Sequence, residues 1–184
     1  LLPPPCHVIS IGSNGDWSFE ADVIRHTQCR VETFDCTMGA NAAPPAALRH
    51  RVRFHAQCIG ANSSRDGRFL DYPSLLAVAG LHNEAPTMLK MDVEGFEWGV
   101  LRGLLHAGQR SARVRAQLPL QIAFELHVQG HTPPEVARLM DDLWRLGNYF
   151  IAKRDDNPYC IDYTELLLVS TKLLASSHRR RTKH

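Results

Sequence analysis

Short apolar runs, each suited to a β-strand, alternate with amphipathic stretches suited to helices along most of the chain. The runs predicted as strands are residues 6–11, 30–35, 51–56, 87–92, 120–128, 148–153 and 163–170. The stretches predicted as helices are residues 17–27, 44–50, 73–82, 94–107 and 132–146. A helix between two strands returns the chain to the starting edge of the sheet, so the strands that it joins run parallel. Only the last two strands lack a helix between them. The pattern therefore predicts a Rossmann-like α/β fold with a mostly parallel sheet, helices on both faces and a closing hairpin.

Length and charge suit one domain. The chain has 184 residues, of which 44% are hydrophobic and 22% are charged, as in ordinary globular proteins. Its net charge of +2 does not produce a strong positive electrostatic potential that would attract nucleic acid, so we expect no nucleic-acid partner. We place the domain at residues 1–175 and expect residues 176–184 to form a basic, disordered tail.

The two ends of the chain carry further expectations. No stretch of 18 uninterrupted apolar residues exists, so we predict no transmembrane segment. Residues 1–5 lead directly into the first predicted strand. From this abrupt start we expect that an N-terminal part of the domain precedes residue 1.

Glycine and acidic residues follow the first two predicted strands. The first strand ends in Gly12-Ser13-Asn14-Gly15, and Asp35 ends the second. Ligands of open α/β sheets bind beyond the carboxyl ends of the strands, near the switch in strand order. A glycine turn lets the backbone approach a ligand closely, and a carboxylate can accept both ribose hydroxyl hydrogens. Together these features favour a nucleoside-bearing cofactor over a plain turn, although a nicotinamide cofactor would fit them as well.

The fourth and fifth parallel strands end in titratable residues. Asp92 and Glu94 follow the fourth strand, and Glu125 and His127 share one face of the fifth by the two-residue period. We predict that His127 is a general base. Asp92 and Glu94 would orient the acceptor or act as the base in place of His127. The plainer alternative is a histidine hydrogen-bonded to Glu125. Glu97 is interpreted as a complement to the helix dipole.

Four segments in chain order resemble the FkbM-type and methyltransferase-like (METTL-type) proteins. They are residues 9–16, 33–37, 89–98 and 120–127, and the Lys90-Met-Asp-Val-Glu-Gly-Phe-Glu97 stretch is the most specific. The resemblance implies strand order 3-2-1-4-5-7-6 with the seventh strand antiparallel. It also implies S-adenosylmethionine bound at Gly12, Ser13, Asn14, Gly15, Asp35 and Cys36, with Cys58 and Ile59 flanking the adenine. Asp92 would lie by the methionine end of the cofactor or by the substrate. Ser10 departs from the family pattern, which often has an acidic residue there.

The resulting expectation is an S-adenosylmethionine-dependent methyltransferase that acts on a hydroxyl of a small molecule or carbohydrate. No residue pattern calls for a metal. Two rivals remain open: a nicotinamide-dependent oxidoreductase, and a non-catalytic binding module that kept the fold.

The cysteines bear on the compartment. Cys6 and Cys29 lie near the amino ends of neighbouring predicted strands, and Cys36 and Cys58 follow the carboxyl ends of another neighbouring pair. Adjacent strands are about 4.8 Å apart, within the reach of a disulfide. Free buried thiols and two disulfides both fit the sequence. Disulfides would indicate an oxidising compartment, such as the secretory pathway.

Overall fold

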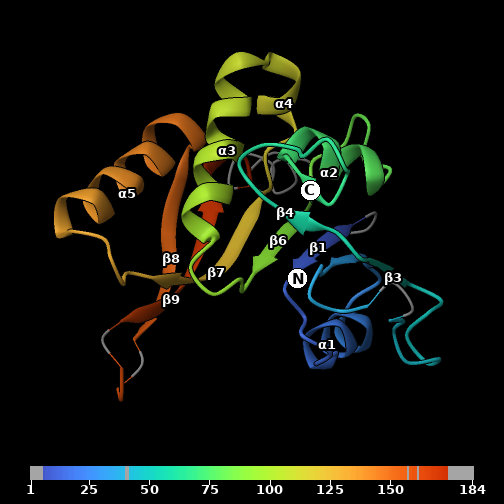
Figure 1. The fold of residues 1–184 in the computed structure, drawn as a ribbon. Coiled ribbons are helices and arrows are strands. Elements are labelled where there is room, and N and C mark those ends of the chain that lie inside the picture. Colours follow the sequence, from blue (N-terminus) through green and yellow to red (C-terminus); the bar gives the residue numbers. More distant parts are fainter. Residues whose placement is uncertain (1–5, 40–41, 157, 161, 174–184) are drawn as a thin grey trace, which may run out of the picture.

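A seven-stranded sheet forms the centre of the protein (Figure 1). The computed structural model describes residues 6–39, 42–156, 158–160 and 162–173. In spatial order the strands are β3 (Val52–His55), β2 (Arg30–Phe34), β1 (His7–Ile11), β6 (Met88–Met91), β7 (Gln121–His127), β9 (Tyr163–Ser170) and β8 (Tyr149–Asp156). β9 runs antiparallel to both of its neighbours, whereas the other pairs are parallel. The predicted strand order is confirmed once two short strands outside this sheet, β4 (Cys58–Ile59) and β5 (Phe69–Leu70), are set aside.

Helices cover the two faces of the sheet unequally. The helices are α1 (Ser18–His26), α2 (Tyr72–Val78), α3 (Glu97–Arg110), α4 (Ala112–Ala116) and α5 (Pro133–Gly147). α2, α3 and α5 contribute to the larger core, together with alternate strand residues such as Leu89, Ile122 and Leu166. α1 packs on the opposite face against Val8, Val31 and Val52. On that face, no helix of the described chain covers β7, β9 and β8.

Three local predictions were wrong. Residues 44–50 form turns instead of a helix, because their hydrogen bonds join residues three apart, as from the Leu48 amide to the Pro45 carbonyl at 2.8 Å. Residues 57–72, for which we predicted neither helix nor strand, contain β4 and β5, which pair with each other in parallel. Residues 110–117, also predicted without regular structure, contain α4, whose Ser111 cap accepts a hydrogen bond from the Val114 amide.

Two disulfides link neighbouring strands, one at their amino ends and one beyond their carboxyl ends. Cys6 pairs with Cys29 at the amino ends of β1 and β2, with 4.6 Å between their Cα atoms. Cys36 pairs with Cys58 beyond the carboxyl ends of β2 and β3, with 4.8 Å between their Cα atoms. Cys160 is free. These are the pairs that the strand order brings together.

Two further predictions concern membrane-spanning segments and the C-terminal tail. None of the helices in the described ranges is long and apolar enough to cross a membrane. The predicted tail at 176–184 lies outside the described residues.

Candidate active site

The glycine turn brings the carboxyl ends of β1 and β6 into close contact. Gly12 has φ +77°, and a Cβ there would overlap the carbonyl oxygen of Asp92. Asn14 and Gly15 also have positive φ. A Cβ on Gly15 would meet only Met38, at 3.8 Å, so the outer part of the turn is open to a ligand. Gly12 therefore joins the two strands, and Gly15 leaves room above them.

The Asp35 carboxylate holds the turn from β2. Its Oδ2 accepts hydrogen bonds from the backbone amides of Ser13, at 3.0 Å, and Asn14, at 2.7 Å. Its Oδ1 accepts from the Thr37 amide at 2.9 Å and from the Thr37 hydroxyl at 2.6 Å. Burial alone would raise the pKa of Asp35, but the hydrogen bonds from Thr37 and Asn14 outweigh it and lower the pKa. Asp35 is thus an ionised acceptor that is 5% exposed.

Lys90 supports the same turn from β6. Its Nζ donates a hydrogen bond to the Gly12 carbonyl at 2.8 Å. Sequence reasoning noted Lys90 within a motif but gave it no role. The signal was its place two residues before Asp92, which puts both side chains on the same face of the strand.

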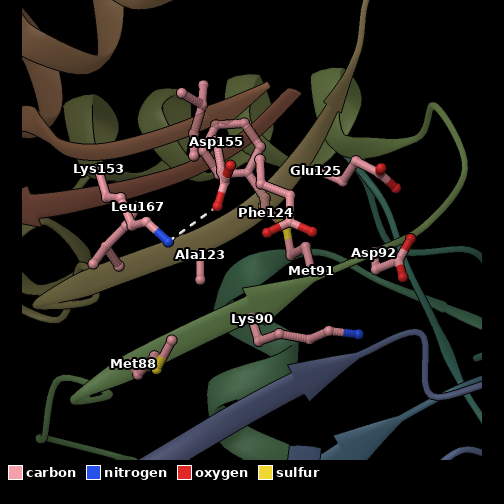
Figure 2. A pocket seen from close by; sticks show the side chains of 12 residues that line it. Met88, Lys90, Met91, Asp92, Ala123, Phe124, Glu125, Lys153, Asp155 and Leu167 are labelled. Atoms are coloured by element: carbon pink, nitrogen blue, oxygen red, sulfur yellow. Dashed lines mark hydrogen bonds and ion pairs between the residues drawn. The ribbon is translucent and has the colours of Figure 1, made fainter. Parts of the chain in front are cut away.

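Carboxylates line a cavity beside the turn. The cavity has a volume of about 310 Å³ and is lined by β6, β7, β9 and β8. Figure 2 shows Lys90, Asp92 and Glu125 extending toward the carboxyl ends of β6 and β7, and a dashed line joins Lys153 to Asp155. These two side chains of β8 form an ion pair at 3.1 Å. Burial raises the pKa of Glu125, His127 lowers it, and Asp92, Glu165 and Glu94 raise it further, with a net rise. Glu125 can therefore hold a proton more readily than an ordinary glutamate.

His127 ends β7 among three carboxylates. Its Nε2 lies 3.5 Å from Glu94 Oε2 and 3.6 Å from Glu125 Oε2, and its Nδ1 lies 3.3 Å from Glu97 Oε1. The His127 side chain is 15% exposed and that of Glu94 is 88% exposed. The 3.6 Å separation from Glu125 is too long for the hydrogen bond of the plainer alternative. His127 is held near Glu94, and the structure brings both predicted residues together.

The interpretation of Glu97 as a helix-dipole complement was incomplete. Its side chain is fully buried, and its two oxygens accept the backbone amides of Val93, at 3.0 Å, and Gly95, at 2.9 Å. These bonds fix a tight turn in which Glu94 has φ +53° and Gly95 has φ +98°. An acidic residue in a first helical turn looks the same in sequence whether it faces solvent or a buried neighbour. Its distinguishing signal was its place within the most specific motif.

Three further side chains predicted to bind the cofactor contact other parts of the chain. Cys36 and Cys58 form a disulfide. Ile59 is 6% exposed and packs in the larger core. Any contact that these positions make with a cofactor would therefore involve backbone atoms or the outer surface of the disulfide.

The sequence matches a family described as a methyltransferase domain over residues 3–169. The chain belongs to this family. A search of curated protein sequences gave no match. The cofactor of this methyltransferase is S-adenosylmethionine, which one of the solved structures similar to it contains. The nicotinamide-dependent alternative finds no support in these comparisons.

Solved structures share the fold. A 16S rRNA (adenine(1408)-N(1))-methyltransferase variant from Catenulisporales acidiphilia, with S-adenosylmethionine, has TM-score 0.50 and 15% identity over 90% of this chain and 85% of its own. A fibrillarin/Nop5p complex has TM-score 0.52 and 12% identity over 92% and 74%. A protein described as a putative S-adenosylmethionine-dependent methyltransferase from Streptococcus mutans has TM-score 0.52 and 10% identity over 89% and 44%. At these identities the likeness shows the fold.

The expectation that excluded nucleic acid was wrong. The first of these structures belongs to an enzyme named for its action on 16S rRNA, and it has the fold of this methyltransferase. A net charge of +2 without a global basic field therefore does not exclude nucleic acid from the partners of such a domain. Local surfaces beside the site, and not net charge, decide which acceptor binds.

The residues at the carboxyl edge fit the cofactor. S-adenosylmethionine combines ribose hydroxyls, which need acceptors, with a positively charged sulfonium, which favours nearby carboxylates. The edge supplies the ionised Asp35 beside the open side of the glycine turn. It also supplies Asp92 and Glu125, which line the adjacent cavity.

Proposed function

We propose that this methyltransferase transfers a methyl group to a hydroxyl oxygen, with His127 Nε2 accepting the hydroxyl proton. The observation that carries the proposal is the position of His127 at the carboxyl end of β7. Its Nε2 lies within 3.6 Å of the carboxylates of Glu94 and Glu125, and Glu125 lines the cavity. An imidazolium formed there would be stabilised by the negative charge of Glu94 and, when Glu125 is ionised, by that of Glu125.

The cofactor supplies a methyl group on a sulfonium, already a good leaving group, so the protein has mainly to align the acceptor. We assign cofactor binding to Gly12, Ser13, Asn14, Gly15 and Asp35. The four acceptor directions of Asp35 are taken by donors of the chain itself. We propose that a ribose hydroxyl replaces the Thr37 hydroxyl, because that donor can rotate away whereas the three amides cannot.

Asp92 and Glu94 are assigned to the acceptor. Both are exposed beside the cavity and His127, and the Asp92 amide is fixed by a hydrogen bond of 3.1 Å to the Ile11 carbonyl. Glu94 has a left-handed backbone conformation, which is costly for a residue other than glycine and is common at functional sites. These carboxylates can accept hydrogen bonds from an acceptor's hydroxyl groups and orient one toward Nε2.

The finer family placement and the compartment are also proposals. The residues of the Lys90–Glu97 motif support a place among the FkbM-type and METTL-type proteins. The two disulfides support folding in an oxidising compartment, such as the secretory pathway. Alkylation of unreduced protein from its native source should label Cys160 alone. Labelling of all five cysteines would contradict the proposal that the protein folds in an oxidising compartment.

A methyl-transfer screen tests the activity. Protein with its disulfides intact is incubated with S-adenosylmethionine labelled in the methyl group and with separate carbohydrate, small-molecule hydroxyl and RNA acceptors. The proposal predicts label in an ether bond of one acceptor class. Label on nitrogen only would contradict the hydroxyl acceptor, and turnover by none of the classes despite cofactor binding would favour the non-catalytic module.

A further inference from the structure

The first turn of α3 holds His127 at two points. Trp98 Nε1 donates a hydrogen bond to the His127 carbonyl at 2.6 Å, which fixes the backbone at the end of β7. Glu97 Oε1 lies 3.3 Å from Nδ1 of the same histidine. Trp98 is itself held in place, because it is buried and stacks on His131 with 3.7 Å between the ring centroids. Two consecutive residues of the helix therefore fix both the main chain and the ring of His127.

Glu97 determines which hydrogen-bonding partner the ring meets on its buried side. The backbone amides of Val93 and Gly95 donate to both of its oxygens, as an ionised carboxylate requires. An ionised carboxylate has only acceptors to offer. The Nδ1 atom of His127 is buried and makes no hydrogen bond with the described residues. Its ion-pair contact is with Glu97 Oε1, at 3.3 Å. A proton on Nδ1 would be attracted to the Glu97 carboxylate, whereas a lone pair there would be repelled by its negative charge.

We propose that Glu97 is a positioning residue that keeps the neutral His127 ring in the Nδ1–H tautomer, so that Nε2 carries the lone pair. The tautomer depends only on the chain's own contacts. Its use in catalysis rests on the proposed function, in which Nε2 receives the proton of the acceptor hydroxyl. Glu97 has no contact with the acceptor in this arrangement and acts through the imidazole.

The proton and electron balance of the transfer is complete with these groups. The hydroxyl oxygen forms its bond to the methyl carbon while the carbon–sulfur bond breaks and leaves its electron pair on sulfur. Nε2 takes the hydroxyl proton, and the resulting imidazolium lies between Glu97 on one side and Glu94 and Glu125 on the other. Water then takes the proton from Nε2, which restores the starting tautomer.

Glu97 also fixes the turn at residues 93–95, so loss of activity alone would not separate positioning from a purely structural role. Nitrogen NMR of the imidazole does separate them, because the two ring nitrogens differ strongly in chemical shift between tautomers. We would label the histidines with ¹⁵N and assign His127 from the signals lost in His127→Gln. We would then compare wild type with Glu97→Gln and with the control Glu135→Gln.

Glu135 is a matched control because it also lies in the first turn of a helix and accepts a backbone amide, that of Thr132 at 2.7 Å. The wild type and Glu135→Gln should show the Nδ1–H tautomer at a pH where the ring is neutral. Glu97→Gln should lose that preference and lower kcat by about 10-fold or more, with the Kd of S-adenosylhomocysteine changed less than twofold.

An Nε2–H tautomer in the wild type would overturn the inference, and this result needs no variant to fold. An unchanged tautomer in folded Glu97→Gln would overturn it too. If the wild type has the Nδ1–H tautomer and Glu97→Gln loses it, but no acceptor is methylated, the positioning stands and the proposed function fails.

Discussion

The half of the sheet built from β3, β2 and β1 differs from the half built from β6, β7, β9 and β8 in how its carboxylates are satisfied. In the first half, Asp35 is buried and accepts five hydrogen bonds from the chain, which saturate it. In the second half, Asp92 and Glu94 are exposed, and Glu125 has a raised pKa. Both disulfides tie the first half, and none joins strands of the second in the described residues.

This difference suits a division of labour. Saturated acceptors and crosslinks fix one backbone geometry, which a cofactor of constant structure requires. Exposed carboxylates and an imidazole remain free to exchange partners with a reacting acceptor. We therefore infer that the first half binds the cofactor and the second half carries the chemistry, with Gly12 at the junction. The predictions below test that division.

The largest effect is expected from Gly12→Ala. The new Cβ would overlap the Asp92 carbonyl, and the backbone has φ +77°. We expect the free energy of unfolding to fall by about 3 kcal/mol or more. Gly15→Ala is the control, since it has φ +78° but open space, and should cost about 1–2 kcal/mol. Denaturant titration compares the two, and equal losses would show that close contact between β1 and β6 is unimportant.

The disulfides should give equal losses of stability but unequal losses of cofactor affinity. They close loops of nearly equal sequence separation, 23 and 22 residues, so each double Cys→Ala variant should lose about 3 kcal/mol. Only removal of Cys36–Cys58, next to Asp35, should weaken S-adenosylhomocysteine binding. Calorimetry at a temperature where both variants are folded measures this. Equal affinities of the two variants for S-adenosylhomocysteine would show that the Cys36–Cys58 bridge does not support the cofactor site.

Asp35→Ala should weaken S-adenosylhomocysteine binding by about 2–3 kcal/mol, since it removes ribose acceptors and frees the glycine turn. Asp141→Ala, which breaks an exposed ion pair with Arg145 on α5, should leave the affinity unchanged. Unchanged affinity in folded Asp35→Ala would remove the ribose assignment and reduce Asp35 to a support for the turn.

The smallest effect concerns Glu125. Its pKa is raised in the folded protein, first by burial, so the folded state disfavours the charged form. The contribution of Glu125 to the free energy of unfolding should therefore be fully present below the ordinary glutamate pKa and be lost as the pH rises through the raised pKa. Glu125→Gln should match wild type in Tm in acid and exceed it slightly at neutral pH. A Tm of Glu125→Gln below that of wild type at neutral pH would mean that the charge of Glu125 stabilises the fold.

Periodicity and topology carried most of the fold prediction. Apolar runs set the strands, and alternation with helices set the order, which in turn placed Cys6 beside Cys29 and Cys36 beside Cys58. The failures were short-range. Residues 44–50 have a proline start suited to a helix, yet turns suffice to cross from β2 to β3. The pairing of β4 with β5 joins segments of two residues each, too short for any periodic signal.

The sequence predicts which side chains gather at the carboxyl ends of the strands, but it does not predict which buried partners other side chains meet. Asp35, Asp92 and His127 lie at the carboxyl ends of parallel strands, so topology brings them to one side of the sheet. Glu97 and Lys90 acquire their roles only from what they face, a buried imidazole and a carbonyl of another strand. No pattern within a single helix or strand records such a partner.

We propose that His127 serves the chemistry and not the cofactor. One preparation of His127→Ala distinguishes these roles when both the turnover of an acceptor found in the screen and the affinity for S-adenosylhomocysteine are measured on it. We expect a fall in turnover of about 100-fold or more with a dissociation constant within twofold of wild type. A collapse of the affinity, or turnover close to that of wild type, would contradict it.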